Sequence, residues 1–297
     1  MAVVDISNTY QLTNVGAHID ATDVYNSNEN LLDNAYFVGG GSQLGDGIFP
    51  INQRGQTSYS SSAVGWFDRW LNGYPQATAT LTANGVKLSA AKWLFQPLRK
   101  EVYEGLEGKT VTASVMLADG TIYSGTNTFT ANSNVHFVWV VAGGENLELR
   151  TSKYGSTPSF QLVNFSPDAG SEMTVAAFKL EKGTVSTLAN DVRPDFGAEL
   201  RKCKRYLRYV PLTRTPAVIG GNTAVVTLNG IEMASVPTPA LISAGGARDA
   251  GGAQNITSAT VTGFTYNTPT VQFALAGNLN YVIGYVYDTV VRLSCEL

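Results

Sequence analysis

The stretch GWFDRWLNG, residues 65–73, carries the residue types in this chain that are best suited to binding a ligand. Trp66 and Trp70 offer aromatic faces on which the C–H faces of a sugar ring can stack. Asp68 and Arg69 lie between them and can bind sugar hydroxyls, and an arginine fork can hold a uronate carboxylate bidentately. The alternative is structural: the indoles fill the space between two sheets while the Asp-Arg pair caps nearby backbone groups.

Tyr154, in TSKYGSTPS, is the other candidate ligand-binding residue. It is an aromatic residue beside a predicted loop, and loops of β-sandwiches commonly carry function. Tyr59, Tyr74, Trp93 and Tyr123 also lie in or beside predicted loops, although the surroundings of Trp93 favour a place in the core.

Catalysis is not predicted. A glycosidase needs two carboxylates roughly 5–10 Å apart, whereas the acidic residues here are scattered along the chain. A Ser-His-Asp site would have to use His18 or His136, and no G-x-S-x-G motif accompanies either histidine. We therefore expect a non-enzymatic protein.

No cofactor is predicted, although a structural calcium ion remains conceivable. Loop residues Asp46 and Glu29 could contribute to such a site, but neither belongs to an EF-hand-like loop. No Cys/His spacing resembles a zinc site. Cys203 and Cys295 either form a disulfide, whose geometry sequence alone does not establish, or are two buried free thiols, and we favour free thiols.

Composition narrows the class of protein. Hydrophobic residues make up 44% of the 297 residues and charged residues only 14%, so Ser, Thr, Asn, Gln and Gly must cover much of the surface. The net charge of −3 gives no basic footprint for nucleic acid. The sequence contains no run of about 18 apolar residues, so no membrane-spanning helix is predicted. The first residues, MAVVDISNTY, have no secretory signal.

The elements that must position these residues are mainly β-strands. Turn signals at Asn84-Gly85, Asp119-Gly120 and Gly143-Gly144 separate runs that alternate in polarity, which is the pattern of hairpins. Five or more short strands at this spacing predict an antiparallel sandwich, of galactose-binding-like or jelly-roll type. Further β signals after residue 210 predict a second, C-terminal β domain. Within it, residues 244–254 have the composition of a mobile loop.

One helix is predicted, over residues 194–210. Phe196, Leu200, Cys203 and Leu207 recur at helical spacing and would form one face. Basic residues gather toward its C-terminal end: Arg201, Lys202, Lys204, Arg205 and Arg208. They form either an anion-binding ridge or a solvated helix face, and we favour the solvated face.

Several stretches resemble phage and prophage tail-fibre-like proteins that carry a carbohydrate-binding-module-like sandwich. They are NLLDNAYF, GWFDRWLNG, QPLRKEVYEGLEGKTVTASVMLADG, FKLEKGTVSTLANDVRPDFGAELRKCKRYL and the closing RLSCEL. That family has a K-L-E-x-G strand leading to a P-D-x-x-x-E-L-x-x-C-x-R-Y helix. The resemblance covers residues 30–210 well and the C-terminal part weakly. Because the DRW motif recurs in the family whatever the ligand, we favour the structural interpretation of residues 65–73.

The sequence and the resemblance together predict four parts: an N-terminal attachment arm (1–29), the sandwich (30–193), a linking helix (194–210) and a C-terminal β domain (211–297). The arm itself matches no part of the family, and its polar sequence is interpreted as a segment that docks on the virion. The resemblance has a further implication. It implies a virion tail or fibre protein, often a homotrimer, made in the bacterial cytoplasm and extracellular after lysis. Its partners would be tail or baseplate proteins, through the arm, and a host cell-surface polysaccharide. The alternative is a structural virion component, such as a baseplate protein, fibre adaptor or head decoration, that binds only other virion proteins.

Overall fold

The computed structural model describes residues 28–38, 49–60, 65–72, 78–89, 94–140, 146–154, 157–164, 172–191, 194–265 and 267–295. The chain forms two compact units. The N-terminal unit comprises residues 1–41, 57–62 and 72–194, and the C-terminal unit comprises residues 42–56, 63–71 and 195–297. Nearly all of the predicted arm, residues 1–27, lies outside the described residues. The predicted mainly-β fold, with a sandwich, a helix and a second β part, is confirmed.

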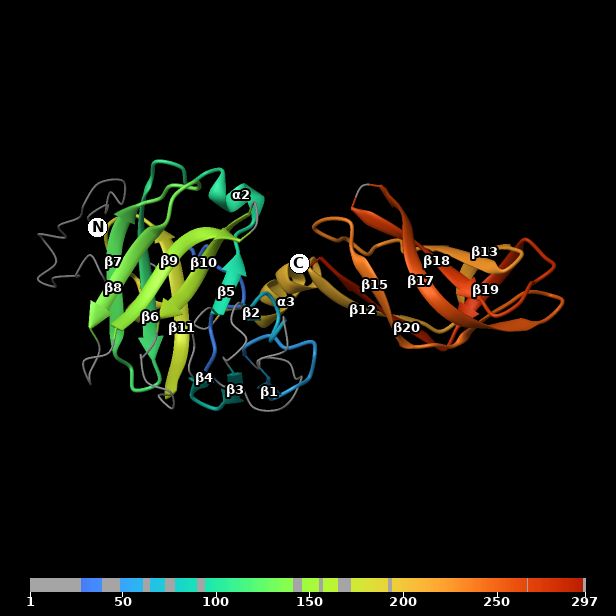
Figure 1. The fold of residues 1–297 in the computed structure, drawn as a ribbon, viewed down its shortest axis with the longest axis horizontal. Helices are drawn as coiled ribbons and strands as arrows, with labels where there is room; N and C mark the ends of the chain where they lie inside the picture. Colours follow the sequence, from blue (N-terminus) through green and yellow to red (C-terminus); the bar gives the residue numbers. More distant parts are fainter. Residues whose placement is uncertain are drawn as a thin grey trace, which may run out of the picture. The chain divides into compact units, whose positions relative to one another are not determined.

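The N-terminal unit is a sandwich of two antiparallel sheets (Figure 1). One sheet has the order β1 (Ser58–Tyr59), β3 (Thr78–Thr82), β4 (Gly85–Ser89), β11 (Glu172–Lys182), β6 (Thr110–Leu117) and β7 (Ile122–Thr128). The other has the order β2 (Leu71–Asn72), β5 (Leu94–Pro97), β10 (Thr157–Asn164), β9 (Asn146–Tyr154) and β8 (Val135–Val140). A short helix, α2 (Lys100–Tyr103), and a 3-10 turn, η1 (Leu188–Asn190), complete the regular elements.

The predicted hairpins are present. Strands β3 and β4, β6 and β7, and β8 and β9 pair as antiparallel neighbours across the three turn signals. Gly85 has a φ of +140°, and a Cβ there would lie 2.2 Å from the carbonyl oxygen of Val175. Glycine is therefore required at this turn by both backbone conformation and space.

Strand β11 is the centre of the sandwich, because it is buried on both faces. On its inner face, Phe178 packs edge-to-face on Phe160 of β10, with 5.8 Å between ring centroids. Along its edge, the side chain of Asn30 donates to the carbonyl of Phe178 at 2.8 Å and accepts from the N–H of Leu180 at 3.2 Å. These two hydrogen bonds attach the NLLDNAYF segment to β11.

The outer face of β11 buries charges. Lys179 and Glu181 are both fully buried. The Lys179 ammonium donates to Asp191 and, at 2.9 Å, to the hydroxyl of Thr187. The Glu181 carboxylate accepts from the N–H of Thr187 at 2.8 Å and from its hydroxyl at 2.6 Å. The K-L-E-x-G sequence thus fastens the segment that follows β11 onto the sandwich.

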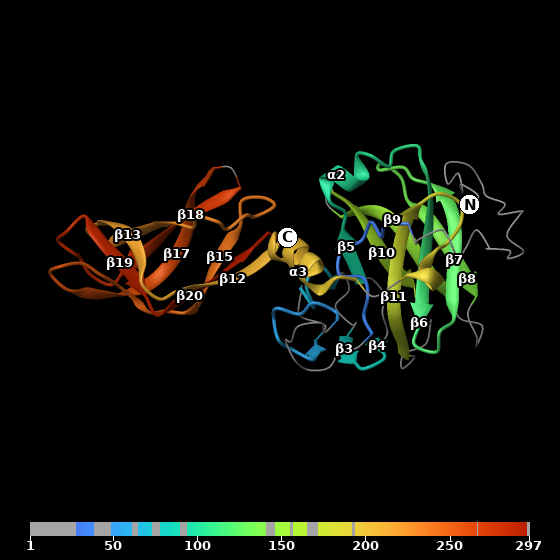
Figure 2. The ribbon, with the colours of Figure 1, turned by 180° about the vertical axis from the view of Figure 1, so that it is seen from behind.

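The C-terminal unit contains helix α3 (Phe196–Lys204), a small sheet and a closed barrel (Figure 2). The sheet has the order β12 (Leu207–Leu212), β20 (Thr289–Ser294) and β15 (Thr238–Ser243). The barrel runs through β13 (Thr215–Gly220), β14 (Thr223–Thr227), β18 (Thr268–Leu275), β17 (Ala253–Thr265), β16 (Gly246–Arg248) and β19 (Ile283–Tyr287). Its core is filled by inward aliphatic and aromatic side chains, among them Val226, Val271, Phe273 and Val286.

Two sequence predictions about this unit are wrong. The helix ends at Lys204 and not at residue 210, because Leu207–Leu212 pairs with β20 as strand β12. Residues 244–254 are not a mobile loop, since they hold β16 and the start of β17, which pair with each other. In both places, pairing with a strand distant in the sequence outweighs the local signal, since β12 pairs with β20 and β16 also pairs with β19. This is the usual limit of propensity arguments.

Cys203 is buried and Cys295 is partly buried, and both are free thiols, as interpreted from the sequence. Within the described ranges, no helix is long and apolar enough to cross a membrane.

Candidate functional site

The segment that the sequence singles out lies in the C-terminal unit and is buried. Trp66 and Trp70 are both 0% exposed, and Asp68 and Arg69 are buried with them. The backbone folds into a tight loop, in which the N–H of Trp66 donates to the carbonyl of Trp70 at 3.0 Å. Neither indole leaves a face open on which a sugar could stack.

Asp68 caps backbone groups from another segment. Its carboxylate accepts from the backbone N–H of Gln53 at 2.9 Å and from the Gln53 side-chain amide at 2.5 Å. The same amide donates to the carbonyl of Leu207 at 2.7 Å, so Gln53 joins the loop to the start of β12. Arg54 adds an ion pair to Asp68 at 3.8 Å.

Arg69 joins the loop to the end of the helix motif. Its backbone adopts a left-handed conformation, with φ at 71°. Its guanidinium lies 3.5 Å from the centroid of the Tyr206 ring, which is a cation–π contact. At the other end of the motif, Asp195 caps α3 by accepting from the N–H of Ala198 at 2.5 Å. The two motifs therefore meet at the contact between Arg69 and Tyr206.

Tyr154 is the last residue of β9, and its side chain lies outside the described side chains. Trp93 and Tyr74 also lie outside the described residues. Tyr59 is buried, whereas Tyr123 is half-buried and packs near Trp139, with 6.4 Å between ring centroids.

A set of polar side chains that the sequence does not single out as a site lies on the outer face of the five-stranded sheet. Phe160 of β10 points to the interior, since it packs on Phe178 of the opposite sheet. Its neighbours in sequence therefore point outward. The cross-strand registers place His136, Glu148, Arg150, Ser152, Ser159 and Gln161 on this outer face, and we name them the polar row.

Contacts connect the members of the polar row in two groups. His136 Nδ1 lies 2.5 Å from Glu148 Oε1. Arg150 Nε donates to Gln161 Oε1 at 3.3 Å, and Gln161 Nε2 donates to the hydroxyl of Ser159 at 2.8 Å. That hydroxyl donates in turn to the backbone carbonyl of Ser152 at 3.1 Å.

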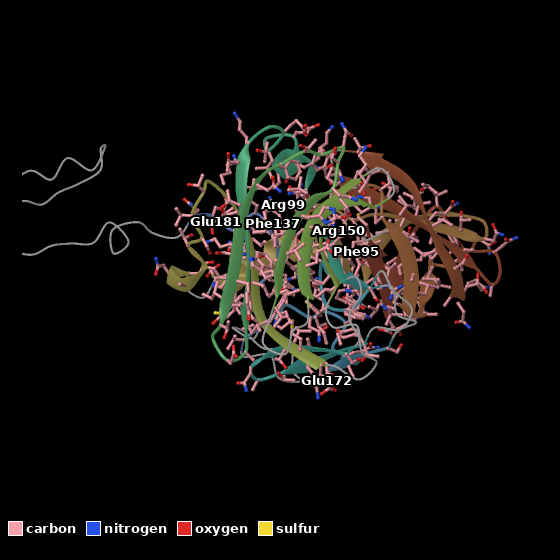
Figure 3. All side chains as sticks on the ribbon, turned by 60° about the vertical axis from the view of Figure 1, so that its left-hand side comes forward. Phe95, Arg99, Phe137, Arg150, Glu172 and Glu181 are labelled. Atoms are coloured by element: carbon pink, nitrogen blue, oxygen red, sulfur yellow. The ribbon has the colours of Figure 1, made fainter. Side chains whose placement is uncertain are left out.

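The side chains of the polar row become more buried from His136 to Ser159. The His136 side chain is 46% exposed and the Glu148 side chain 14%, whereas Gln161 is 5% and Ser159 0% exposed. Gln161 of β10 lies between its two cross-strand partners, Phe95 of β5 and Arg150 of β9. Figure 3 shows the side chains of Phe95 and Arg150 on this sheet. The arrangement offers imidazole, carboxylate, guanidinium and amide groups, from the exposed His136 to the buried Gln161, which is suited to binding hydroxyl groups.

The sequence suggests His136 only as a possible member of a Ser-His-Asp site, which is not predicted. The signal that could have found the polar row is the alternation in NVHFVWVV and NLELRTS, where His136, Glu148 and Arg150 occupy the same face. Their convergence with Gln161 depends on strand register, which alternation alone does not provide.

A second surface lies at one end of the barrel, and we name Val218, Tyr281, Val282 and Ile283 the barrel tip. All four are exposed, Ile283 at 82%. Val218 of β13 and Ile283 of β19 are direct cross-strand partners. Contiguous exposed apolar side chains of this kind mark interaction surfaces more often than chance positions do.

Asp249 holds the barrel tip in place. One carboxylate oxygen accepts from the N–H groups of Gly251 and Gly252, and the other from those of Asn280 and Tyr281, at 2.7–2.9 Å. Loss of hydration raises the pKa of this carboxyl, but the hydrogen bonds from the four N–H groups outweigh it and hold the pKa below 3.8.

Acidification is therefore expected to loosen the barrel tip. Because the folded-state pKa of Asp249 is lowered, its contribution to stability is present above the unfolded pKa and is lost as the pH falls through the folded pKa. The protection factors of the four donor amides, which are corrected for the intrinsic pH dependence of exchange, should fall at pH values below about 4, and in Asp249→Asn they should be low at neutral pH as well. Asp119→Asn, at another hairpin carboxylate, should leave these amides unchanged; equal protection in Asp249→Asn would contradict the anchoring role.

In the described part of the chain, no three His, Cys, Asp or Glu side chains lie close enough together to hold a metal ion. Of the residues considered for calcium, Glu29 is exposed and Asp46 lies outside the described residues. Compared with protein-family models, curated proteins and solved structures, the chain matches none of them.

Proposed function

We propose that this chain is a bacteriophage virion tail or fibre protein that binds a host-surface glycan without cleaving it, and that the polar row is the binding surface. The observation that carries the proposal is the passage from exposed His136 to buried Gln161 along one sheet face. Sugar hydroxyls need donors and acceptors that are already oriented, and the mutual hydrogen bonds of the polar row provide this orientation. The low charge of the chain and its resemblance to tail-fibre-like proteins support the same assignment.

Binding at one such site would be weak, and assembly would compensate for it. A homotrimer on the virion presents three copies to one cell surface, which raises avidity without any new contact. The N-terminal arm would join the protein to other tail or baseplate proteins.

The proposal is tested first on cells. Labelled protein should bind intact host bacteria saturably, and excess unlabelled protein or purified surface polysaccharide should displace it. An assembled oligomer that does not bind the host of the parent virion would rule out receptor binding.

The site itself is tested with a matched pair of substitutions. Glu148→Gln removes the carboxylate from the polar row, and we expect it to weaken polysaccharide binding by about tenfold or more, because hydrogen bonds to a charged group are worth roughly 1.5–3 kcal/mol. Glu172→Gln makes the same chemical change in an exposed ion pair with Lys87, on the other sheet (Figure 3), and should leave binding unchanged. Calorimetric titration measures both; equal affinities, with unchanged melting temperatures, would exclude the polar row.

The barrel tip favours a second function, that of a structural virion component. Exposed Val282 and Ile283 are suited to burial against another protein and not to hydration. In that case, Ile283→Asp should abolish incorporation of the protein into virions while leaving its melting temperature unchanged. Normal incorporation of this variant would exclude the tip as the assembly surface.

A further inference from the structure

The C-terminal unit contains a cavity of about 550 Å³ beside helix α3, and we name it the basic pocket. Five cationic side chains and one carboxylate line it: Arg201, Lys202, Lys204, Arg205, Arg208 and Glu232. Its size falls within the range of small-molecule sites, roughly 300–1,000 Å³. It is therefore large enough for more than a single inorganic ion.

The concentration of charge here is unusual for this chain. The whole sequence has 20 lysines and arginines, and five of them line this one cavity. Arg201 and Arg205 lie four residues apart and both line the basic pocket, where their like charges repel each other. An anion bound between them would offset this repulsion.

Three of the five cations form no salt bridge within the described residues: Arg201, Lys204 and Arg208. Lys202 does pair with a carboxylate, since its ammonium lies 3.3 Å from Glu199. Cations do favour the C-terminal end of a helix. That effect does not account for Arg208, which belongs to strand β12 and still lines the same cavity.

We propose that the basic pocket binds a phosphorylated saccharide. Arginine forks match phosphate oxygens bidentately, and three of the five cations are arginines. Glu232 is the acceptor in the same cavity, and it would take hydrogen bonds from sugar hydroxyls. The ligand is either a free sugar phosphate or a phosphate-bearing cell-surface polysaccharide. The site is separate from the polar row and does not depend on glycan binding there.

The test is calorimetric titration of the full chain with glucose 1-phosphate, inorganic pyrophosphate and glucose, at low and at physiological salt. We expect glucose 1-phosphate to bind, to weaken as salt rises, and to be displaced by pyrophosphate, while glucose does not bind. Pyrophosphate binding without glucose 1-phosphate binding would overturn the saccharide assignment, and the absence of binding by both would overturn the site. Competition by a phosphorylated polysaccharide, but not by its dephosphorylated form, would identify the surface polymer as a source.

Substitutions locate the site. Arg201→Gln combined with Arg208→Gln should lower affinity for glucose 1-phosphate at least tenfold per arginine removed. Arg214→Gln combined with Arg248→Gln makes the same change at exposed positions of this unit outside the basic pocket and should leave affinity unchanged. Arg208→Lys keeps the charge and should lose only part of the affinity. Equal losses in both pairs would overturn the location, and Glu148→Gln should have no effect here.

Discussion

Lys179→Ala is expected to lower the free energy of unfolding of the N-terminal unit by about 3–5 kcal/mol. The substitution leaves Glu181 without its only ammonium neighbour among the described residues and removes the partner of Asp191. Both Lys179 and Glu181 are fully buried, so water cannot replace the lost partner without opening the structure. Differential scanning calorimetry should show that this unit unfolds at a lower temperature.

Lys182→Ala is the matched control. Lys182 lies at the end of the same strand but is exposed, so its removal should change stability by less than about 0.5 kcal/mol. If the two lysine substitutions cost the same, the buried charge network would not be what fastens the segment after β11.

Trp70→Ala is the second substitution with a large expected effect, about 3–5 kcal/mol in the C-terminal unit. Trp70 is fully buried and its ring lies 6.3 Å from that of Phe67, so alanine would leave a cavity inside the loop that Asp68 and Arg69 fix. The measurement is thermal unfolding, combined with glycan binding by the folded fraction. Trp70→Ala should lower the unfolding temperature, while the glycan affinity of the molecules that remain folded should be unchanged.

This result distinguishes architecture from ligand binding in residues 65–73. A stacking platform would lose affinity on Trp70→Ala while keeping its melting temperature. Trp139→Ala is the comparison, since Trp139 is only half-buried and its removal should cost less. If Trp70→Ala proved the milder substitution, the burial of residue 70 would not have the structural role inferred here.

Local signals predicted the parts of the fold that local physics decides. Alternation and turn residues located the hairpins at Gly85 and Gly120, because side-chain direction and positive φ are properties of single strands and turns. The predicted start of the helix, residue 194, lies close to the observed one, where Asp195 caps α3. The end of the helix was misplaced, since Leu207 continues the helical pattern but pairs with Ser294 in β20.

The candidate sites show the same limit. The aromatic residues of 65–73 were visible in the sequence, but whether they face a ligand or a core depends on what packs over them. The polar row was overlooked because each of its members is unremarkable alone, and Glu148, Arg150 and Gln161 become neighbours only through the register of β8, β9 and β10.

By itself, the sequence determined that this chain is mainly β, that it contains a helix beginning near Asp195, and that basic residues concentrate toward the C-terminal end of this helix. These properties follow from periodicity and composition, which act over a few residues. Only the tertiary structure decided that the two tryptophans are buried, that Lys179 and Glu181 form an interior network, and that the cations after residue 200 line one cavity. The physical reason is that burial and the meeting of charges depend on contacts between segments far apart in the chain.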